Sequence, residues 1–190
     1  MLKQISKLKT RIIAKALIRE CGKNLKIGHS SHIKGHKQIS IGDNFFSGPY
    51  LYLNTNKISR IDIGHDVMLG PFVKLISGNH VLDYKYGPMN SAPHKKKGQD
   101  KGIKIEDDVW IGTSSILLDG CLLSEGVVIG AGSIVTKYIP PYVIAAGNPA
   151  KIIKPRFSIS ELEIHLKAKN SRLHIEGIRK EYLKYGIVYD

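Results

Sequence analysis

His80 is the residue whose setting best fits acid–base chemistry. It ends the segment Ser77-Gly78-Asn79-His80, where a regular hydrophobic pattern stops and about twenty residues with little such pattern begin. A long loop inside a compact fold tends to be functional or disordered. An imidazole titrates near about pH 6.5 and can remove a proton from a hydroxyl group at neutral pH. The sequence therefore indicates His80 as a candidate general base.

Asp83 follows three residues later and could orient the imidazole, as a carboxylate does for other histidine bases. An ordinary loop carboxylate is the favoured interpretation. The other histidines occupy the loosely patterned start, a variable slot, the lysine-rich loop or the C-terminal segment: His29, His32, His36, His65, His94, His165 and His174.

Two tyrosines are candidates for binding a ligand. Tyr50 and Tyr52 alternate with leucines, so their rings point away from the core if this segment is a strand. They could line a site, since sugars are commonly bound on such exposed rings. Core packing or a subunit contact, together with Phe45 and Phe46, is the other interpretation.

A six-residue repeat predicts the elements that position these residues. From Ile105 to Pro140 the chain reads IEDDVW IGTSSI LLDGCL LSEGVV IGAGSI VTKYIP. Each block opens with an aliphatic residue and carries a small or aliphatic residue four places later. This period fits neither a helix nor a long strand, but short strands joined by corners return the same side chain inward. The repeat therefore predicts a solenoid of parallel β coils.

The rest of the chain divides around this repeat. We expect an N-terminal helix at 1–24, a solenoid at 25–156 with a Pro-, Gly- and Lys-rich loop insertion at 81–102, and a C-terminal helix within 157–190. The first helix is basic and amphipathic, which is compatible with weak association with a membrane surface. The favoured interpretation is that it packs on the first coil and covers the open end of the solenoid. Ser158 and Glu161 predict a capping box for a helix from about 159 to 185, with Gly177 as a candidate break.

Composition agrees with one narrow solenoid. The 190 residues suffice for a continuous core, aromatics are only 7%, and 19 glycines suit frequent corners. Cys21 and Cys121 lack metal-ligand spacing, and Cys121 falls in an inward slot, which favours a buried thiol in a reducing compartment. Without a signal peptide or a long apolar run, we expect a soluble, cytoplasmic protein.

The chain is strongly basic, with 29 Lys and Arg against 16 Asp and Glu and a net charge of +13. Such an excess attracts polyanions, among them nucleic acid, anionic lipid, an acidic glycan or cofactor phosphates. No aromatic RNA-binding pair, helix-turn-helix signal or zinc finger is evident, so nucleic acid is not expected as a partner.

Three further pieces carry a family resemblance: Asp107-Asp108-Val109-Trp110-Ile111-Gly112, Gly130-Ala131-Gly132-Ser133-Ile134-Val135-Thr136-Lys137, and Ala146-Gly147-Asn148-Pro149-Ala150-Lys151. With Gly78-Asn79-His80 they resemble the hexapeptide-repeat acyltransferases, in particular the maltose, galactoside and capsular-polysaccharide O-acetyltransferase branch. The likeness covers roughly residues 25 to 156. It implies an all-β fold, a left-handed parallel β-helix of triangular coils, here with N-terminal and C-terminal α-helical segments.

The resemblance also implies a function. It implies direct transfer of acetyl from acetyl-CoA to a hydroxyl of a sugar or surface polysaccharide, with His80 as base, in a homotrimer with sites between subunits. By resemblance, the residues that bind acetyl-CoA are Trp110, Gly112, Thr113, Ala131, Gly132, Thr136, Lys137, Lys151 and Lys154. Lysines serve phosphates as point charges, although a plain surface charge is favoured for Lys151.

The sequence favours three other interpretations less. The γ-class carbonic anhydrases share the fold but hold zinc with three histidines, a pattern not evident around His80, so no metal is expected. A non-catalytic β-helix scaffold would show a regular exposed face, whereas the variable slots here are mixed. A xenobiotic acetyltransferase of the streptogramin or chloramphenicol type shares the Asn-His-x-x-Asp element. The loop after His80 lacks the Ser-Thr-Tyr-Pro stretch of those enzymes, which favours a sugar.

Overall fold

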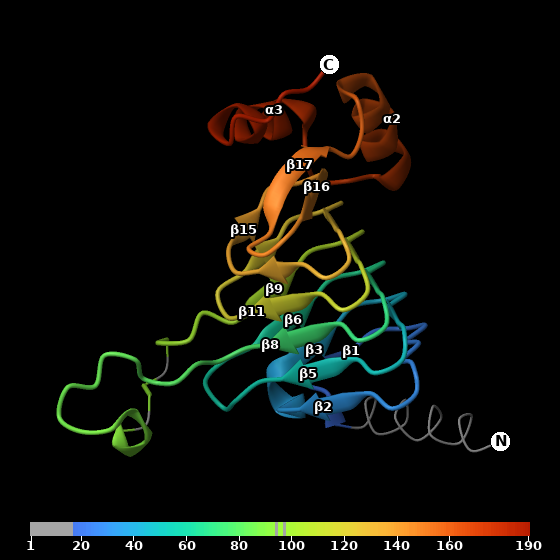
Figure 1. Cartoon of the computed structure of the whole chain (residues 1–190). Helices are drawn as coiled ribbons and strands as arrows, with labels where there is room; N and C mark the ends of the chain where they lie inside the picture. The colour runs from blue at the N-terminus through green and yellow to red at the C-terminus, as the bar shows by residue number, and fades with distance from the viewer. Residues whose placement is uncertain (1–16, 94, 97) are drawn as a thin grey trace.

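The computed structural model describes residues 17–93, 95–96 and 98–190, and it shows three sheets of short strands stacked as the sides of a prism (Figure 1). Sheet A consists of β1 (Glu20–Cys21), β3 (Ile39–Ile41), β6 (Ile61–Ile63), β9 (Ile103–Ile105), β12 (Leu122–Leu123) and β15 (Tyr138–Ile139). Sheet B consists of β4 (Phe46–Ser47), β7 (Met68–Leu69), β10 (Trp110–Ile111), β13 (Val128–Ile129), β16 (Val143–Ala146) and β17 (Lys151–Pro155). Sheet C consists of β2 (His32–Lys34), β5 (Tyr52–Asn54), β8 (Lys74–Ile76), β11 (Ile116–Leu118) and β14 (Ile134–Val135).

Parallel pairing between successive coils follows the hexapeptide register. Trp110 pairs with Met68 below and Val128 above, and Leu117 pairs in the same way with Leu75 and Val135. Among the described strands, β17 alone runs antiparallel, folding back on β16. The chain passes from sheet C to A, then to B, and back to C. We call the three sets of turns the C-to-A, A-to-B and B-to-C corners.

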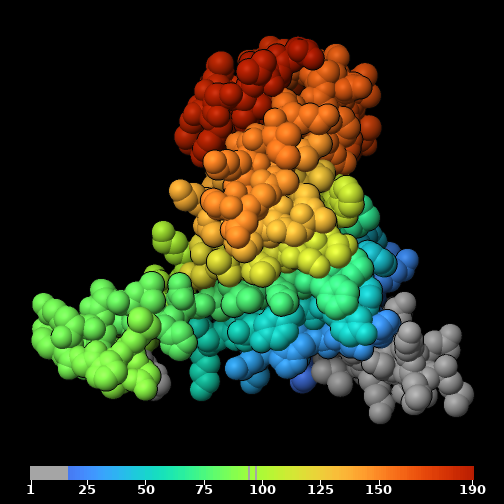
Figure 2. All heavy atoms as spheres, in the orientation of Figure 1, coloured from blue at the N-terminus to red at the C-terminus, as the bar shows by residue number. Residues whose placement is uncertain are grey.

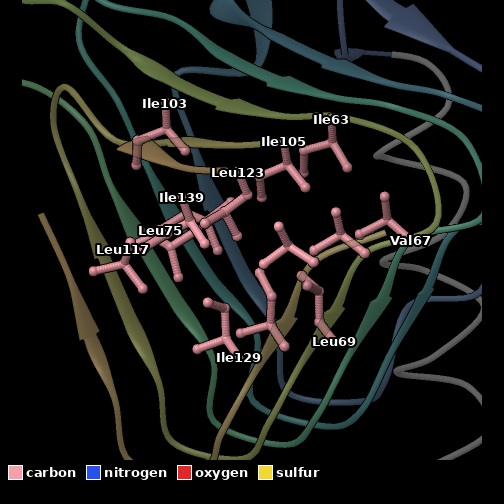
Figure 3. Close-up of a cluster of buried hydrophobic side chains, with 14 of the residues drawn as sticks. Ile63, Val67, Leu69, Leu75, Ile103, Ile105, Leu117, Leu123, Ile129 and Ile139 are labelled. Atoms are coloured by element: carbon pink, nitrogen blue, oxygen red, sulfur yellow. The ribbon is translucent and has the colours of Figure 1, made fainter. Parts of the chain in front are cut away.

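The interior is a column of stacked aliphatic side chains. Figure 3 shows such residues from different coils, among them Ile105, Leu123 and Leu75, directed toward one another. The first and fifth positions of all six blocks are buried: Ile105, Val109, Ile111, Ser115, Leu117, Cys121, Leu123, Val127, Ile129, Ser133, Val135 and Ile139. The inward slots predicted from the repeat, including that of Cys121, are thus confirmed. Burial raises the pKa of the Cys121 thiol to about 12, with the nearby charge of Asp119 adding to the effect.

Extra residues gather at the C-to-A corner. There the short helical turn η1 (His36–Gln38) precedes β3, residues 55–60 connect β5 to β6, and residues 77–102, with the short helical turn η2 (Met89–Ser91), connect β8 to β9. The next coil crosses the same corner by a tight turn at Asp119-Gly120. Residues 77–102, here the 77–102 insertion, project from the side of the prism (Figure 2).

The two ends differ from the sequence expectation. The predicted helix over 1–24 is wrong from Glu20 on, because β1 already pairs with Ser40 and Ile41 of β3. Residues 1–16 of this prediction lie outside the described residues. In place of one long C-terminal helix there are two, α2 (Ile159–Lys169) and α3 (Ile175–Lys184). The break lies at Asn170, which ends α2 in a left-handed conformation, whereas Gly177 lies inside α3.

The start of α2 agrees with the sequence. The Ser158 hydroxyl accepts from the N–H of Glu161, and the Glu161 carboxylate accepts from the N–H of Ser158, so the predicted capping box is confirmed. In the part of the chain that the structure describes, no helix has the length and apolar character needed to cross a membrane.

Candidate active site

His80 is exposed at the C-to-A corner, four residues beyond the end of β8. Its backbone N–H donates to the side-chain oxygen of Asn79 at 3.3 Å. Asp83 is also exposed, and no hydrogen bond or ion pair joins its carboxylate to the imidazole of His80. The structure thus presents His80 to solvent, and its orientation depends on how the segment from Ser77 to Asn79 is held.

Asp119 holds both ends of the 77–102 insertion. Its Oδ1 accepts from the hydroxyl of Ser77 at 3.0 Å and from the N–H groups of Gly78 at 3.0 Å and Gly102 at 2.9 Å. Its Oδ2 accepts from the N–H of Lys101 at 3.0 Å. Burial acts to raise the pKa of Asp119, but these donors outweigh it, and the pKa lies below its ordinary value. The ionised carboxylate therefore closes the insertion at its base.

Asp100 makes a second anchor, which holds the residue before His80. Only 6% of Asp100 is exposed, and it accepts from Lys95 Nζ at 2.5 Å, Asn56 Nδ2 at 3.1 Å and the N–H of Asn79 at 3.2 Å. Burial acts to raise its pKa, but the hydrogen bonds from Lys95 and Asn56 and the Lys95 charge lower it overall. The residue before His80 is thereby tied to the far end of the insertion.

Neither anchor was predicted from the sequence. The signal was present for Asp119: Leu118 stacks on Ile76, so the next residue, Asp119, lies over Ser77, where the insertion starts. Finding it required the stacking register across the insertion. Asp100 left no comparable signal, since its partners come from three separate segments.

Two hollows flank His80. The larger, here the coil groove, has a volume of about 1180 Å³ and runs along the corner toward the N-terminal coils. Its lining residues are Leu17, Lys34, Gly35, His36, Lys37, Gln38, Asn54, Thr55, Asn56, Lys57, Ile76, Ser77, Gly78, Asn79 and His80. The smaller, here the insertion groove, has about 710 Å³ and is lined by Asn56, Lys57, Ile58, Asn79, His80, Val81, Met89, Asn90, Ala92, Pro93 and Lys95. His80 is part of the lining of both hollows, so a substrate in either would lie beside it.

Trp110 lies on a different side of the prism. It projects outward from sheet B with 50% of its surface exposed, in register with Met68 at 49% and Phe46 at 47%. Three large apolar side chains from successive coils thus form an exposed apolar column on sheet B. The outward orientation predicted for Trp110 agrees with this geometry.

The small residues predicted to bind acetyl-CoA line the B-to-C corner. Gly112 and Thr113 follow β10, and Ala131 and Gly132 follow β13 one coil above. A Cβ on Gly112 would lie 2.6 Å from the backbone nitrogen of Ala131, so only glycine allows the coils to stack this closely. Thr113, Ala131 and Gly132 are exposed, and a ligand could lie against backbone along this corner.

The remaining cofactor candidates lie toward the C-terminal end. Thr136 and Lys137 are exposed in the turn from β14 to β15, at the C-to-A corner but on the C-terminal side of His80. Lys151 and Lys154 are exposed on β17, which pairs with β16.

One chain does not bring all of these residues together. His80, Thr136 and Lys137 share the C-to-A corner, whereas Trp110 lies on sheet B and the small residues line the B-to-C corner.

The two tyrosines lie outside both hollows. Tyr50 stacks on Phe72 with ring centroids 4.6 Å apart, and Tyr52 stacks on His32 at 5.2 Å. Neither ring lines the coil groove or the insertion groove. Among residues 17–93, 95–96 and 98–190, no group of three or more His, Cys, Asp or Glu side chains could hold a metal ion.

Comparison with known proteins identifies the class of this molecule. An acetyltransferase of Schizosaccharomyces pombe is 42% identical over 60% of this chain and 54% of its own length, so the match spans about half of that relative. A chloramphenicol acetyltransferase of Klebsiella aerogenes is 30% identical over 82% of this chain and 79% of its own. The galactoside O-acetyltransferase of Escherichia coli K12 is 35% identical over 67% of this chain and 62% of its own length. No family model matches the chain.

Solved structures agree with the sequence relatives. A maltose O-acetyltransferase of Clostridium difficile 630 is 32% identical, with a TM-score of 0.62 over 80% of this chain and 76% of its own. A hexapeptide-repeat acetyltransferase of Vibrio cholerae O1 biovar eltor, solved with acetyl-CoA, is 26% identical. Its TM-score is 0.63 over 80% of this chain and 78% of its own. The fold and the relatives define an acetyltransferase built on a left-handed parallel β-helix, as predicted. The chain belongs to the hexapeptide-repeat acetyltransferase family, in the branch of the galactoside and maltose O-acetyltransferases.

Proposed function

We propose that this protein transfers an acetyl group from acetyl-CoA to a hydroxyl group of a sugar or surface polysaccharide, and that it acts in the cytoplasm. The observation that carries the proposal is the exposed His80 between two hollows, at a corner held by Asp119 and Asp100. The galactoside and maltose relatives support a sugar acceptor, and the acetyl-CoA complex of the Vibrio cholerae structure supports the donor.

His80 acts as a general base in this proposal. A neutral hydroxyl is a poor nucleophile, so its proton must leave as the oxygen attacks the thioester carbonyl. The imidazole accepts that proton and can return it to the departing thiolate of CoA. The acetyl group passes directly between the two substrates, and no acetyl-enzyme forms. Asp83 is proposed at most to assist, because no hydrogen bond or ion pair joins its carboxylate to His80 in this structure.

A neighbouring subunit completes the proposed site. His80 and Trp110 lie on different sides of one prism, so a second copy must bring its sheet B and B-to-C corner against the C-to-A corner of the first. The apolar column of Phe46, Met68 and Trp110 supports such a contact, since exposed apolar patches commonly mark interfaces. We propose a homotrimer, a closed ring of three subunits in which each subunit contacts one neighbour through sheet B and the other through its C-to-A corner.

The proposed path of acetyl-CoA follows from the same placement. The pantetheine would lie along the B-to-C corner beside Gly112, Thr113, Ala131 and Gly132. The phosphates would lie nearer the C-terminal coils, where Thr136, Lys137, Lys151 and Lys154 are exposed.

A second candidate function is acetylation of a xenobiotic. The Klebsiella aerogenes chloramphenicol acetyltransferase, which matches over most of both chains, favours it. The insertion also exposes apolar side chains that could contact an aromatic drug, among them Leu82, Tyr86 and Met89.

A turnover screen separates these functions. Thiol release from acetyl-CoA is followed with mono-, oligo- and polysaccharides and with chloramphenicol and a streptogramin, and each product is identified by mass. We expect a sugar product with an added acetyl group. Drug turnover with no sugar turnover selects the second function, and failure to bind acetyl-CoA or CoA favours a scaffold without catalysis.

A further inference from the structure

The coil groove lies on the N-terminal side of His80, away from the proposed cofactor path. In sheet C the strand order is β14-β11-β8-β5-β2, and His80 follows β8. Thr136 and Lys137 follow β14, which lies two coils toward the C-terminus. The groove lies beyond the ends of β5 and β2, which are one and two coils toward the N-terminus. His80 thus lies between the proposed acetyl-CoA residues on its C-terminal side and the coil groove on its N-terminal side, where the acceptor could bind.

The lining of this groove is cationic. The basic and imidazole side chains along it are Lys34, His36, Lys37, Lys57 and His80, and no Asp or Glu occurs among its lining residues in the described chain. None of the ammonium groups of Lys34, Lys37 and Lys57 has an ion-pair partner among the described residues. Three unneutralised lysines therefore face or border a single hollow.

Two acids near this corner form ion pairs, and the carboxylate of Asp119 is bound by hydroxyl and N–H groups at the base of the insertion. Asp62 pairs with Arg19 at 3.0 Å and Arg60 at 3.2 Å, and Asp100 pairs with Lys95 at 2.5 Å with 1% of its side chain exposed. Neither carboxylate lines the coil groove. A hollow walled by positive charges raises the local concentration of anionic ligands and favours their binding.

We propose that the acceptor carries an anionic group, a carboxylate or a phosphate, that the coil groove binds while the acceptor hydroxyl is presented to His80. This inference rests on the proposed function and narrows its substrate class to acidic sugars or sugar phosphates. A groove of about 1180 Å³ exceeds the volume needed for one monosaccharide, so an acidic oligosaccharide fits it.

Matched acceptors test the inference. Acetyl transfer and binding by calorimetry are measured for galactose against galacturonic acid, for glucose against glucose 6-phosphate, and for neutral against uronic-acid oligosaccharides. We expect kcat/KM to be at least about tenfold higher for the anionic member of a pair, and the advantage to shrink as salt rises. Comparison of the uronic acids with glucose 6-phosphate shows whether the groove prefers a carboxylate or a phosphate.

Lysine variants locate the effect. Each of the variants Lys34→Ala, Lys37→Ala and Lys57→Ala should lower kcat/KM for anionic acceptors by about threefold to tenfold. None of them should change kcat/KM for neutral acceptors or the KM for acetyl-CoA. Lys74→Ala is the matched control, because Lys74 is an exposed lysine of sheet C outside the groove lining.

The binding arm separates this inference from the proposed function. Anionic sugars that bind in a lysine-dependent way without being acetylated would uphold the groove and contradict the acetyl-transfer proposal. Equal use of neutral and anionic acceptors, or lysine variants that match Lys74→Ala, would overturn the anionic groove even if sugars are acetylated. Absence of binding by every anionic compound would also overturn it.

Discussion

Asp119→Ala removes the carboxylate that closes the 77–102 insertion beneath His80. Five donors lose this acceptor, namely the hydroxyls of Ser59 and Ser77 and the N–H groups of Gly78, Lys101 and Gly102. A buried donor without a partner costs about 1–3 kcal/mol, and water can replace part of the loss at a half-buried site. We therefore expect the free energy of unfolding to fall by about 2–4 kcal/mol.

The same change should reduce catalysis. Gly78 lies two residues before His80, so release of its N–H allows the histidine to move. A misplacement of about 1 Å can cost about 100-fold in rate. We expect kcat to fall by about tenfold to 100-fold, while the KM for acetyl-CoA changes little because its proposed residues lie elsewhere.

The pH dependence of stability provides a second readout. The folded-state pKa of Asp119 lies below its ordinary value, so the carboxylate stabilises the fold fully above about pH 4 and loses this effect as the pH falls through the folded pKa. Asp119→Ala should therefore flatten the acid limb of the stability curve below about pH 4. Denaturant titrations at several pH values measure the difference.

Two variants control this prediction. Asp119→Asn keeps an oxygen that can accept from Gly78 and Gly102 but loses the charge, so it should lie between wild type and Asp119→Ala. Asp66→Ala also removes an aspartate that accepts a hydrogen bond between coils, from Asn44 at 2.8 Å, and it should leave kcat unchanged. Wild-type kcat and stability in Asp119→Ala would refute the anchoring role.

Three further predictions concern the cofactor, the assembly and the C-terminal helices. Lys137→Ala and Lys154→Ala should each raise the KM for acetyl-CoA several-fold and leave the acceptor KM nearly unchanged in initial-rate assays; equal effects on both would indicate a structural role. Sedimentation should show a homotrimer that Trp110→Glu dissociates, and a stable, fully active wild-type monomer would contradict the shared site. Asp108→Ala should lower the free energy of unfolding by about 1–3 kcal/mol in denaturant titrations, since Asp108 pairs with Arg156 at 3.0 Å and contacts His165 of α2 at 3.2 Å; an unchanged stability would show that this pairing contributes nothing.

The coil interior could be predicted because it is local and periodic. A repeat of six places Ile111, Leu117 and Leu123 inside in any coil of this kind, and all three are buried. The outward position of Trp110 follows from the same alternation. The capping box of α2 was predictable for a similar reason, since Ser158 and Glu161 lie three residues apart.

Contacts between distant coils could not be predicted in the same way. Asp119 lies over Ser77 because the whole 77–102 insertion is looped out between β8 and β9, so this contact follows only once the coil after the insertion is stacked on the coil before it. The antiparallel return of β17 depends on pairing with β16, and the end of α2 depends on the left-handed conformation of Asn170. These features arise from tertiary contacts rather than from periodicity.

The most direct test of the account is the turnover number of His80→Ala with acetyl-CoA and an acceptor found in the screen. Loss of a general base typically costs on the order of 10²–10⁴ in rate. We expect kcat to fall by that factor while acetyl-CoA still binds and the assembly is preserved, and His65→Ala, at an exposed position on another corner, to retain wild-type kcat. Wild-type turnover by a correctly assembled His80→Ala protein would contradict the central claim.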